Sequence, residues 1–481
     1  MIHILPTPRV CQTITEERRA LAPTVYTTEP TWQGAMDAFC ESAAKIYGLT
    51  LTKGKEGGVV LLKDSTLAPD AYVLDTAEGV VIRAANAEGA QYGLATALQL
   101  LQAQNGALFV PTVHIEDAPE KEYRSMMIDL ARAWHPFDKV LKYVDLCYFY
   151  KVKYLHLHLS DTQAYRYPSK AFPKLCVEGQ YYTFEEIKRL HDYAAARGIT
   201  LIPEVECPGH TTLLANAYPD IFADHADEAH QTVCDPLQFE HGQAGVICAG
   251  SDKSFEGLQL LLAEVAEMFP TSPYLHIGGD EAPYGVWEHC ADCKAYMKEK
   301  GIASAYELYG EYVGRVAAYV LTLGKTPIVW EGFPKESSHY IPKETVVIAW
   351  ESRYQLPHEL LENGFKIINA SWKPLYIVPR LRYEQFTWEQ VLNWNMYNWQ
   401  NWHPKSYATL NPINIAPTDD LLGSQLSVWE AHYEQMISRL LQNLPAFAER
   451  AWRFERKIDR DTYRLTFDVL NAKVTRLIAD R

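Results

Sequence analysis

The sequence is poor in positive charge. Its 45 Lys and Arg residues are outnumbered by 60 Asp and Glu residues, and the formal net charge is −15. Nucleic acids and anionic membranes bind basic surfaces, so this balance argues against both kinds of partner. The sequence also lacks any run near the ~18 consecutive apolar residues of a membrane-spanning helix. We therefore expect no nucleic-acid partner and no membrane partner.

Cysteine is also scarce. Nine Cys residues are scattered along the chain, an odd number without the regular spacing of a disulfide framework. The first residues show neither the basic region nor the apolar run of a signal peptide. Together these features predict a cytoplasmic protein. The pair Cys290-x-x-Cys293 could bind a metal or perform redox chemistry, but it has no second such pair, and we interpret it as a reduced pair on a helix.

The pattern of apolar residues divides the chain near residue 118. Residues 1–118 contain strand-like segments at 59–62, 71–74 and 79–83, followed by helical periodicity over 90–102. This part carries no cluster of chemically distinctive residues, and we expect a small α+β domain. Residues 119–481 are expected to form the catalytic domain.

From Tyr123 onward, short apolar runs alternate with longer segments of helical periodicity. The expected strands are 124–130, 154–159, 200–203, 274–277, 327–330, 346–350, 366–370 and 422–428, and the expected helices include 137–150, 184–197, 255–269 and 304–323. Eight strand–helix repeats favour a (β/α)₈ TIM barrel over a large open doubly wound sheet. No Gly-rich phosphate loop follows the first expected strand, which weakens the nucleotide-binding form of that alternative.

Polar and aromatic residues recur at the C-terminal ends of the expected strands, where such barrels place their active sites. Two chemistries fit this composition. One is a metal site of the amidohydrolase type, built from His156, His158, His210, His276 and Asp280. The other is glycoside cleavage by carboxylates in an aromatic-lined pocket, and the number of Trp and Tyr residues favours it.

Residues 276–281, with the sequence HIGGDE, place two adjacent carboxylates after a short buried strand and two glycines. An acidic pair alone is more often a solvated turn than a catalytic site. At the end of a barrel strand, however, two close carboxylates resist joint ionisation, which favours holding one protonated as a general acid.

The motif at 276–281 matches, without a change, a signature of the family 20 glycoside hydrolases, the β-N-acetylhexosaminidases. Segments 124–132, 155–161 and 203–210 resemble further motifs of this family, and the resemblance covers nearly the whole chain. It implies an exo-acting enzyme that removes terminal β-linked N-acetylglucosamine or N-acetylgalactosamine from an oligosaccharide or glycoconjugate. It also implies retaining hydrolysis in which the substrate's own acetamide is the nucleophile, without a cofactor or metal.

The resemblance implies a role for each matching residue. Glu281 would act as acid and then base, and Asp280 would orient the acetamide, whose oxygen Tyr376 would bind. The other expected sugar contacts are Arg132, Trp330, Trp350, Trp429 and Glu430. Glu204, His210 and Asp161 would support these residues without contacting the sugar. The pair His210 and Asp161 is either a relay to the acid or a buried ion pair.

The sequence departs from the family pattern around the expected sugar contacts. Val378 stands where many members have Asp, Glu206 stands where Asp is usual, and Glu430 is one residue closer to Trp429 than in many relatives. These changes leave open the preference between the two sugars, and the sequence does not reveal the linkage or the oligomeric state. A sugar-binding relative without catalysis would be expected to have lost one of the two acids, and both are present.

Overall fold

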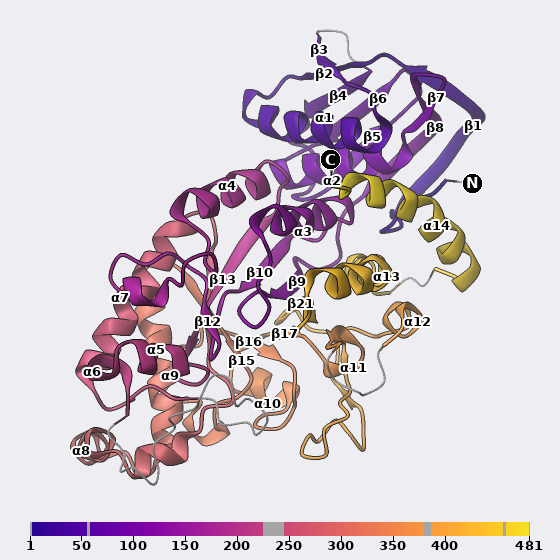
Figure 1. Ribbon diagram of the computed structural model, residues 1–481. Coiled ribbons are helices and arrows are strands. Elements are labelled where there is room, and N and C mark those ends of the chain that lie inside the picture. Colours follow the sequence, from indigo (N-terminus) through magenta and orange to yellow (C-terminus); the bar gives the residue numbers. More distant parts are fainter. Residues whose placement is uncertain (1, 55–57, 225–244, 380–385, 456–457, 481) are drawn as a thin grey trace.

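A mixed sheet forms the N-terminal domain, drawn in indigo and violet in Figure 1. The computed structural model describes residues 2–54, 58–224, 245–379, 386–455 and 458–480. The strand order is β1-β8-β5-β6-β4-β2-β3, and β7 pairs with β8. The strands are β1 (Val10–Leu21), β2 (Thr24–Thr27), β3 (Thr52–Lys53), β4 (Val59–Lys63), β5 (Tyr72–Asp75), β6 (Val80–Ala84), β7 (Gln102–Gln104) and β8 (Ala107–Asp117).

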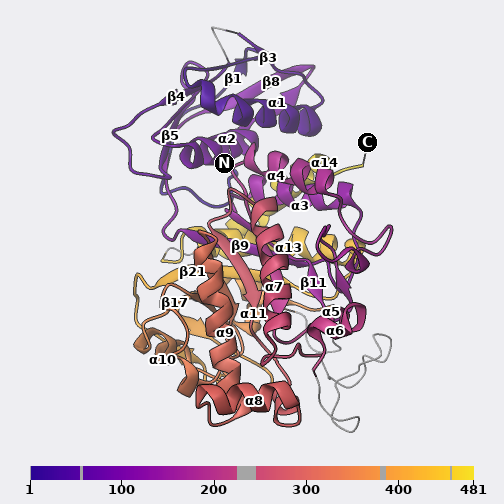
Figure 2. The same cartoon turned by 90° about the vertical axis from the view of Figure 1, so that its left-hand side faces the viewer.

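Helices α1 (Gln33–Tyr47) and α2 (Ala87–Leu100) join this sheet to the rest of the molecule. Almost every residue of α2 is buried, because the helix lies between the sheet and α3 (Phe137–Phe149). The amides of Gln91 and Gln99 cross the interface and donate to the carbonyls of Ala196 and Phe149, each at 2.7 Å. The N-terminal domain therefore packs on the outer helices of the second body, as Figure 2 shows.

Eight parallel strands close into a barrel after the N-terminal sheet. They are β9 (Tyr123–Asp129), β10 (Tyr154–His158), β13 (Thr200–Cys207), β14 (Tyr274–Gly278), β15 (Thr326–Trp330), β16 (Val346–Ala349), β17 (Lys366–Asn369) and β21 (Leu421–Val428). Strand β21 pairs with both β17 and β9, so the sheet has no free edge at that point. The eight expected strands and the barrel are confirmed, and the open-sheet alternative is wrong.

The helices that follow the strands differ between the two halves of the barrel. The first half carries α3, α4 (Phe184–Ala195), α7 (Asp252–Met268) and α9 (Ala305–Thr322), with the shorter α5 (Thr212–Ala217), α6 (Pro219–Phe222) and α8 (Ala291–Lys300). Helices α3, α4, α7 and α9 match the four expected helices to within a few residues at each end. The second half is irregular: residues 331–345 hold only a short 3₁₀ turn, and α10 (Pro357–Glu362), α11 (Trp372–Leu375) and α12 (Trp388–Leu392) are short.

Two long helices complete the chain. Helix α13 (Tyr433–Trp452) follows the last barrel strand, and α14 (Arg460–Leu477) packs against α1 and α3, touching both domains. In the described part of the chain, no helix has both the length and the apolar character that crossing a membrane requires.

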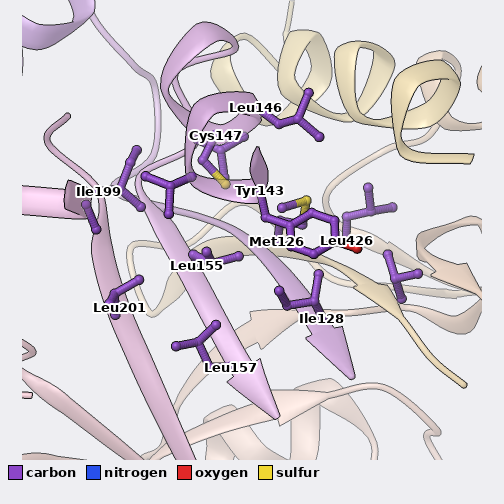
Figure 3. Packing of buried hydrophobic residues seen from close by; sticks show 14 of the residues in the cluster. Met126, Ile128, Tyr143, Leu146, Cys147, Leu155, Leu157, Ile199, Leu201 and Leu426 are labelled. Atoms are coloured by element: carbon purple, nitrogen blue, oxygen red, sulfur yellow. The ribbon is translucent and has the colours of Figure 1, made fainter. Parts of the chain in front are cut away.

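Alternation along the strands explains why the barrel interior is polar at one end. On β10, Leu155 and Leu157 point outward and belong to the same buried apolar cluster as Tyr143 and Cys147 of α3, as Figure 3 shows. Side chains of neighbouring residues leave a strand on opposite faces, so His156 and His158 point into the barrel. Packing of the apolar residues against the outer helices therefore fixes the polar residues between them in positions that face the barrel interior.

Candidate active site

A pocket of about 250 Å³ opens at the C-terminal ends of the barrel strands. It brings together nine of the residues to which the sequence analysis assigned a role: Arg132, His210, Asp280, Glu281, Trp330, Trp350, Tyr376, Trp429 and Glu430. Glu206, Trp372, Val378 and Trp402 complete the lining. Asp161 and Glu204 do not line the pocket, but both are bonded to residues that do.

The turn after β14 aims Asp280 and Glu281 at the pocket. Gly278 and Gly279 have φ angles of 66° and 93°, and Glu281 itself has a φ of 47°. A Cβ atom on Gly278 would lie 1.8 Å from the Oε2 atom of Glu206, so this position requires glycine both for its backbone and for its neighbour. Gly278 of the sequence motif thus makes room for a third carboxyl group beside the pair.

A chain of charged groups runs behind Glu281. His210 Nε2 lies 3.5 Å from Glu281 Oε2, and His210 Nδ1 lies 3.2 Å from Asp161 Oδ1. The other oxygen of Asp161 is 2.7 Å from Arg132 Nη2. Burial alone would raise the pKa of Asp161, but Arg132 and His210 hold it well below its usual range. The sequence-predicted pair His210 and Asp161 is therefore assembled, and it contacts the expected acid directly.

Glu204 anchors a second group of buried residues. Its carboxylate contacts His156 Nε2 at 3.1 Å and His276 Nδ1 at 2.8 Å, and it is also bonded to His158. Trp330 Nε1 donates to it at 2.7 Å. Burial alone would raise the pKa of Glu204, but the three imidazoles lower it well below its usual range. Glu204 thus fixes the orientation of a pocket indole without touching the pocket.

The metal-dependent alternative required four histidines to surround one ion, and these hydrogen bonds and ion pairs place the histidines in two separate groups. Of the described residues, His156 and His276 gather around Glu204, whereas His210 gathers with Asp280 and Glu281. The single five-residue ligand set expected for an amidohydrolase-type site is therefore not assembled.

The two adjacent carboxyl groups have opposite pKa shifts. Burial raises the pKa of Asp280 to about 7, and the charges of Glu281 and Glu204 add to this against the opposing charge of His210. For Glu281, burial also acts to raise the pKa, but the hydrogen bond and charge of His210 outweigh it and lower the pKa. The sequence predicted one protonated member as the acid. Here the more readily protonated member is Asp280, because burial dominates its pKa, whereas the hydrogen bond and charge of His210 dominate the pKa of Glu281.

Aromatic rings form the opposite wall. Trp350 and Tyr376 are stacked, with ring centroids 5.8 Å apart and an angle of 11° between planes. Trp372 stacks on Tyr376 at 4.4 Å, and Trp330 lies 5.7 Å from Trp429. Flat apolar rings around a small polar-ended cavity suit the faces of a sugar.

Tyr376 reaches this wall from β18 (Tyr376–Ile377), which lies outside the ring of eight barrel strands. Strand β18 pairs in parallel with β21, and the backbone N–H of Trp429 donates to the carbonyl of Ile377 at 2.9 Å. This added strand places Tyr376 beside Trp429, with ring centroids 6.2 Å apart.

Several buried polar atoms in the pocket lack partners among the described residues. They are Asp280 Oδ1, Glu206 Oε2 and Arg132 Nε, and the hydroxyl of Tyr376 has no acceptor for its proton. Buried polar groups in folded proteins are nearly always bonded, so such a group calls for a polar ligand or water. The pocket therefore offers a ligand one hydrogen-bond acceptor, Asp280 Oδ1, and one donor, the hydroxyl of Tyr376.

Sequence reasoning missed Trp402. Its ring lies edge-on to Trp372, 5.5 Å away at 69°, in a segment between β19 (Asn398–Trp399) and β20 (Ile413–Asn414) that follows no strand–helix repeat. The local richness in Trp was the one available signal. Glu331, by contrast, directly follows an expected strand but is structural, because its buried carboxylate accepts hydrogen bonds from five backbone N–H groups, those of residues 351–355.

Family models match both domains. The model described as glycosyl hydrolase family 20, catalytic domain, matches residues 122–455, and the model described as glycosyl hydrolase family 20, domain 2, matches residues 1–118.

Known proteins resemble the chain in sequence and in fold. The β-hexosaminidase of Vibrio furnissii is 33% identical over 334 residues, which are 64% of this chain and 53% of that protein. The β-hexosaminidase subunit beta of Entamoeba histolytica is 28% identical over 408 residues, covering 82% of this chain and 71% of that one. This chain thus spans about half the length of the Vibrio furnissii relative.

Among solved structures, the exo β-N-acetylglucosaminidase of Vibrio harveyi in complex with N-acetylglucosamine has a TM-score of 0.84. It covers 99% of this chain and 78% of its own at 24% identity, and the likeness is one of fold.

Proposed function

The chain belongs to glycosyl hydrolase family 20, and from that premise we propose that it is an exo-acting β-N-acetylhexosaminidase. It would remove a terminal β-linked N-acetylglucosamine or N-acetylgalactosamine from an oligosaccharide or glycoconjugate, with retention at C1. One observation carries this proposal, and it concerns two groups in one tryptophan-lined pocket. Among the described residues, Asp280 Oδ1 has no hydrogen-bond donor and the hydroxyl of Tyr376 has no acceptor for its proton. An acetamide group, with its N–H and C=O, supplies the partner of each.

In the first step, the acetamide oxygen attacks C1 while the bond from C1 to the leaving oxygen breaks. Asp280, as a carboxylate, accepts from the acetamide N–H and stabilises the positive charge that spreads over the new ring. Glu281 gives its proton to the leaving oxygen. In the second step Glu281 takes a proton from water, whose oxygen attacks C1 and restores the acetamide.

Glu281 needs a proton for the first step, although its pKa in the free protein is lowered. Its side chain is 46% exposed, whereas Asp280 is 8% exposed. A sugar bound over Glu281 removes water from it, and desolvation raises the pKa of a carboxyl group. Substrate binding would thus prepare the acid, while the acetamide N–H and His210 favour the ionised form of Asp280.

The other lining residues would hold the sugar. Trp330, Trp350 and Trp429 would enclose the acetamide methyl, and Arg132 would bind ring hydroxyls with its guanidinium, which Asp129 and Asp161 hold in place. Glu430 would bind outer hydroxyls; its backbone N–H is fixed by Asp129 Oδ2 at 3.1 Å. His210 and Asp161 would relay charge changes to Glu281.

Release of nitrophenol from a β-N-acetylglucosaminide, compared with the matching β-glucoside, tests the proposal. The glucoside lacks the acetamide and should be essentially inert, because the nucleophile is part of the substrate. NMR of the first product should show the β-anomer. Equal turnover of the glucoside, or a covalent glycosyl ester trapped on Asp280 or Glu281, contradicts the mechanism. Sugar binding without any turnover would instead support the catalytically weak relative.

A further inference from the structure

Three buried thiols meet beside the barrel, outside the sugar pocket. Cys248 lies just before α7, Cys290 caps the N-terminus of α8, and Cys293 sits in the first turn of that helix. The sulfur of Cys248 lies 3.6 Å from that of Cys290 and 3.7 Å from that of Cys293, and all three sulfurs lie within 4.8 Å of one another. Each side chain is fully buried, and none lines the pocket.

The separations between the sulfur atoms fit a shared metal ion. Zinc binds thiolate sulfur at about 2.3 Å, so two sulfurs at neighbouring corners of a tetrahedron around it lie about 3.8 Å apart. A disulfide bond brings its sulfurs to about 2.05 Å. Two separations of 3.6 and 3.7 Å therefore match a zinc site and match no disulfide. The spacing Cys-x-x-Cys is also that of a common zinc ligand pair.

The surrounding backbone is built for close approach around the three thiols. A Cβ atom on Gly250 would lie 2.5 Å from the Cα atom of Cys293, so glycine lets the segment bearing Cys248 reach α8. The guanidinium of Arg315 donates to the carbonyl of Ala249 at 2.7 Å. A zinc ion with three thiolates carries one net negative charge, and this nearby cation offsets it.

We propose that Cys248, Cys290 and Cys293 bind a structural Zn²⁺ ion. The sequence alone presented a Cys-x-x-Cys pair without a companion, and the third donor lies 42 residues before Cys290. These three sulfurs are the donors that the described residues supply, and the ion completes its tetrahedron with one further ligand. The ion takes no part in the sugar chemistry.

The ion joins the two loops that carry the expected acid and its histidine. The backbone N–H of Ile247 donates to Pro208, and that of Thr211 donates to Gly245, which ties the Cys248 segment to both sides of His210. On the other loop, Trp287 Nε1 donates to the carbonyl of Ile247 at 3.1 Å. Metal bonds from Cys248 to the start of α8 therefore hold the loop of His210 against the loop of Glu281.

Metal analysis of the full chain, purified under reducing conditions without chelator, tests the site. We expect about one zinc per chain in the wild type and about a tenth of that or less in Cys248→Ser, Cys290→Ser and Cys293→Ser. The matched control is Cys147→Ser, a buried thiol on α3 outside the cluster, which should keep its zinc. X-ray absorption should show at least three sulfur ligands at about 2.3 Å.

Several outcomes overturn the proposal. They are wild-type protein without zinc after refolding with the metal, unchanged zinc in all three cluster variants, an iron–sulfur cluster, or a disulfide between any two of the three cysteines. If the serine variants do not fold, the wild type exchanged with Co²⁺ decides, because tetrahedral thiolate ligation gives intense visible bands and other ligation does not. None of these readouts depends on glycosidase activity.

A separate experiment tests whether the zinc ion stabilises the fold by holding the two loops together. Removing the ion with a chelator should lower Tm by about 5 °C or more, and added zinc should restore it, because a ligand bound only to the folded state stabilises that state. Cys147→Ser should respond as the wild type does. An unchanged Tm after complete removal of the metal overturns the structural role.

Discussion

The two halves of the barrel supply different kinds of residue to the site: the first half supplies most of the charged groups, and the second half supplies the aromatic rings. The strands from β9 to β14 bring Arg132, Asp161, His210, Asp280 and Glu281, and full helices follow them. The strands from β15 to β21 bring the tryptophans and Tyr376, and the described residues between these strands form irregular connections with only short helices. Bond making needs groups fixed to within fractions of an ångström, which regular helices and paired charges provide. Enclosing a sugar needs broad surfaces, which irregular connections can carry.

Removing the acid should give the largest effect on the charged half. Glu281→Gln should lower kcat by about 10²–10⁴ on an unactivated disaccharide, the usual contribution of positioned acid–base catalysis. The loss should be smaller for a nitrophenyl glycoside, whose leaving group needs little protonation. Steady-state kinetics on both substrates measures the difference. Near-normal turnover of the disaccharide would assign the acid elsewhere.

Asp280→Asn should give the next largest effect. It should lower kcat by about 10²–10³ with a smaller change in KM, because the carboxylate acts on charge that develops in the transition state. Circular dichroism should show an unchanged fold. A change in KM alone would mean that Asp280 only binds the ground state.

The aromatic half should respond differently. Trp372→Leu should raise KM about tenfold while kcat changes only a few-fold, because a lost aromatic contact of about 1.4 kcal/mol weakens ground state and transition state alike. Trp388→Leu is the matched control, since Trp388 stacks on Tyr463 and does not line the pocket. If Trp372→Leu lowered kcat a hundredfold at constant KM, the division between the halves would fail.

Val378 should set a mild preference among outer hydroxyls. The wild type should hydrolyse nitrophenyl β-N-acetylglucosaminide and β-N-acetylgalactosaminide with kcat/KM values within about 10² of each other, because an acceptor at this position is missing. Val378→Asp should increase the ratio of the two kcat/KM values by an amount that corresponds to one hydrogen bond, about 1–2 kcal/mol. A wild-type preference above about 10⁴ would show that another residue replaces the missing acceptor.

The raised pKa of Asp280 predicts a pH-dependent stability. Its pKa rises from 3.8 to about 7 on folding, so its contribution to stability is fully present below about pH 4 and is lost as pH rises through about 7. Asn cannot ionise, so Asp280→Asn should gain in Tm over the wild type by a few degrees more at pH 8 than at pH 4. Thermal unfolding at both values measures this gain, and an equal difference at the two pH values contradicts the shift.

The sequence by itself determined the eight barrel strands, the long helices of the first half and the two adjacent carboxyl groups. Short-range sequence patterns predict these features, because apolar periodicity indicates strands and helices, and the glycines before Asp280 permit the turn. The family resemblance assigned roles to nine of the pocket residues, and most of them meet at one rim because parallel strands bring their C-terminal ends together.

Only the tertiary structure decided which side chains are paired and which stand unpaired. It raised the pKa of Asp280 through burial while His210 lowered that of Glu281, added Trp402 from an irregular connection, and placed Tyr376 on a strand outside the ring. It also brought Cys248 to the pair at Cys290 and Cys293. Each of these depends on contacts between residues far apart in the chain, for which no local periodicity gives a signal.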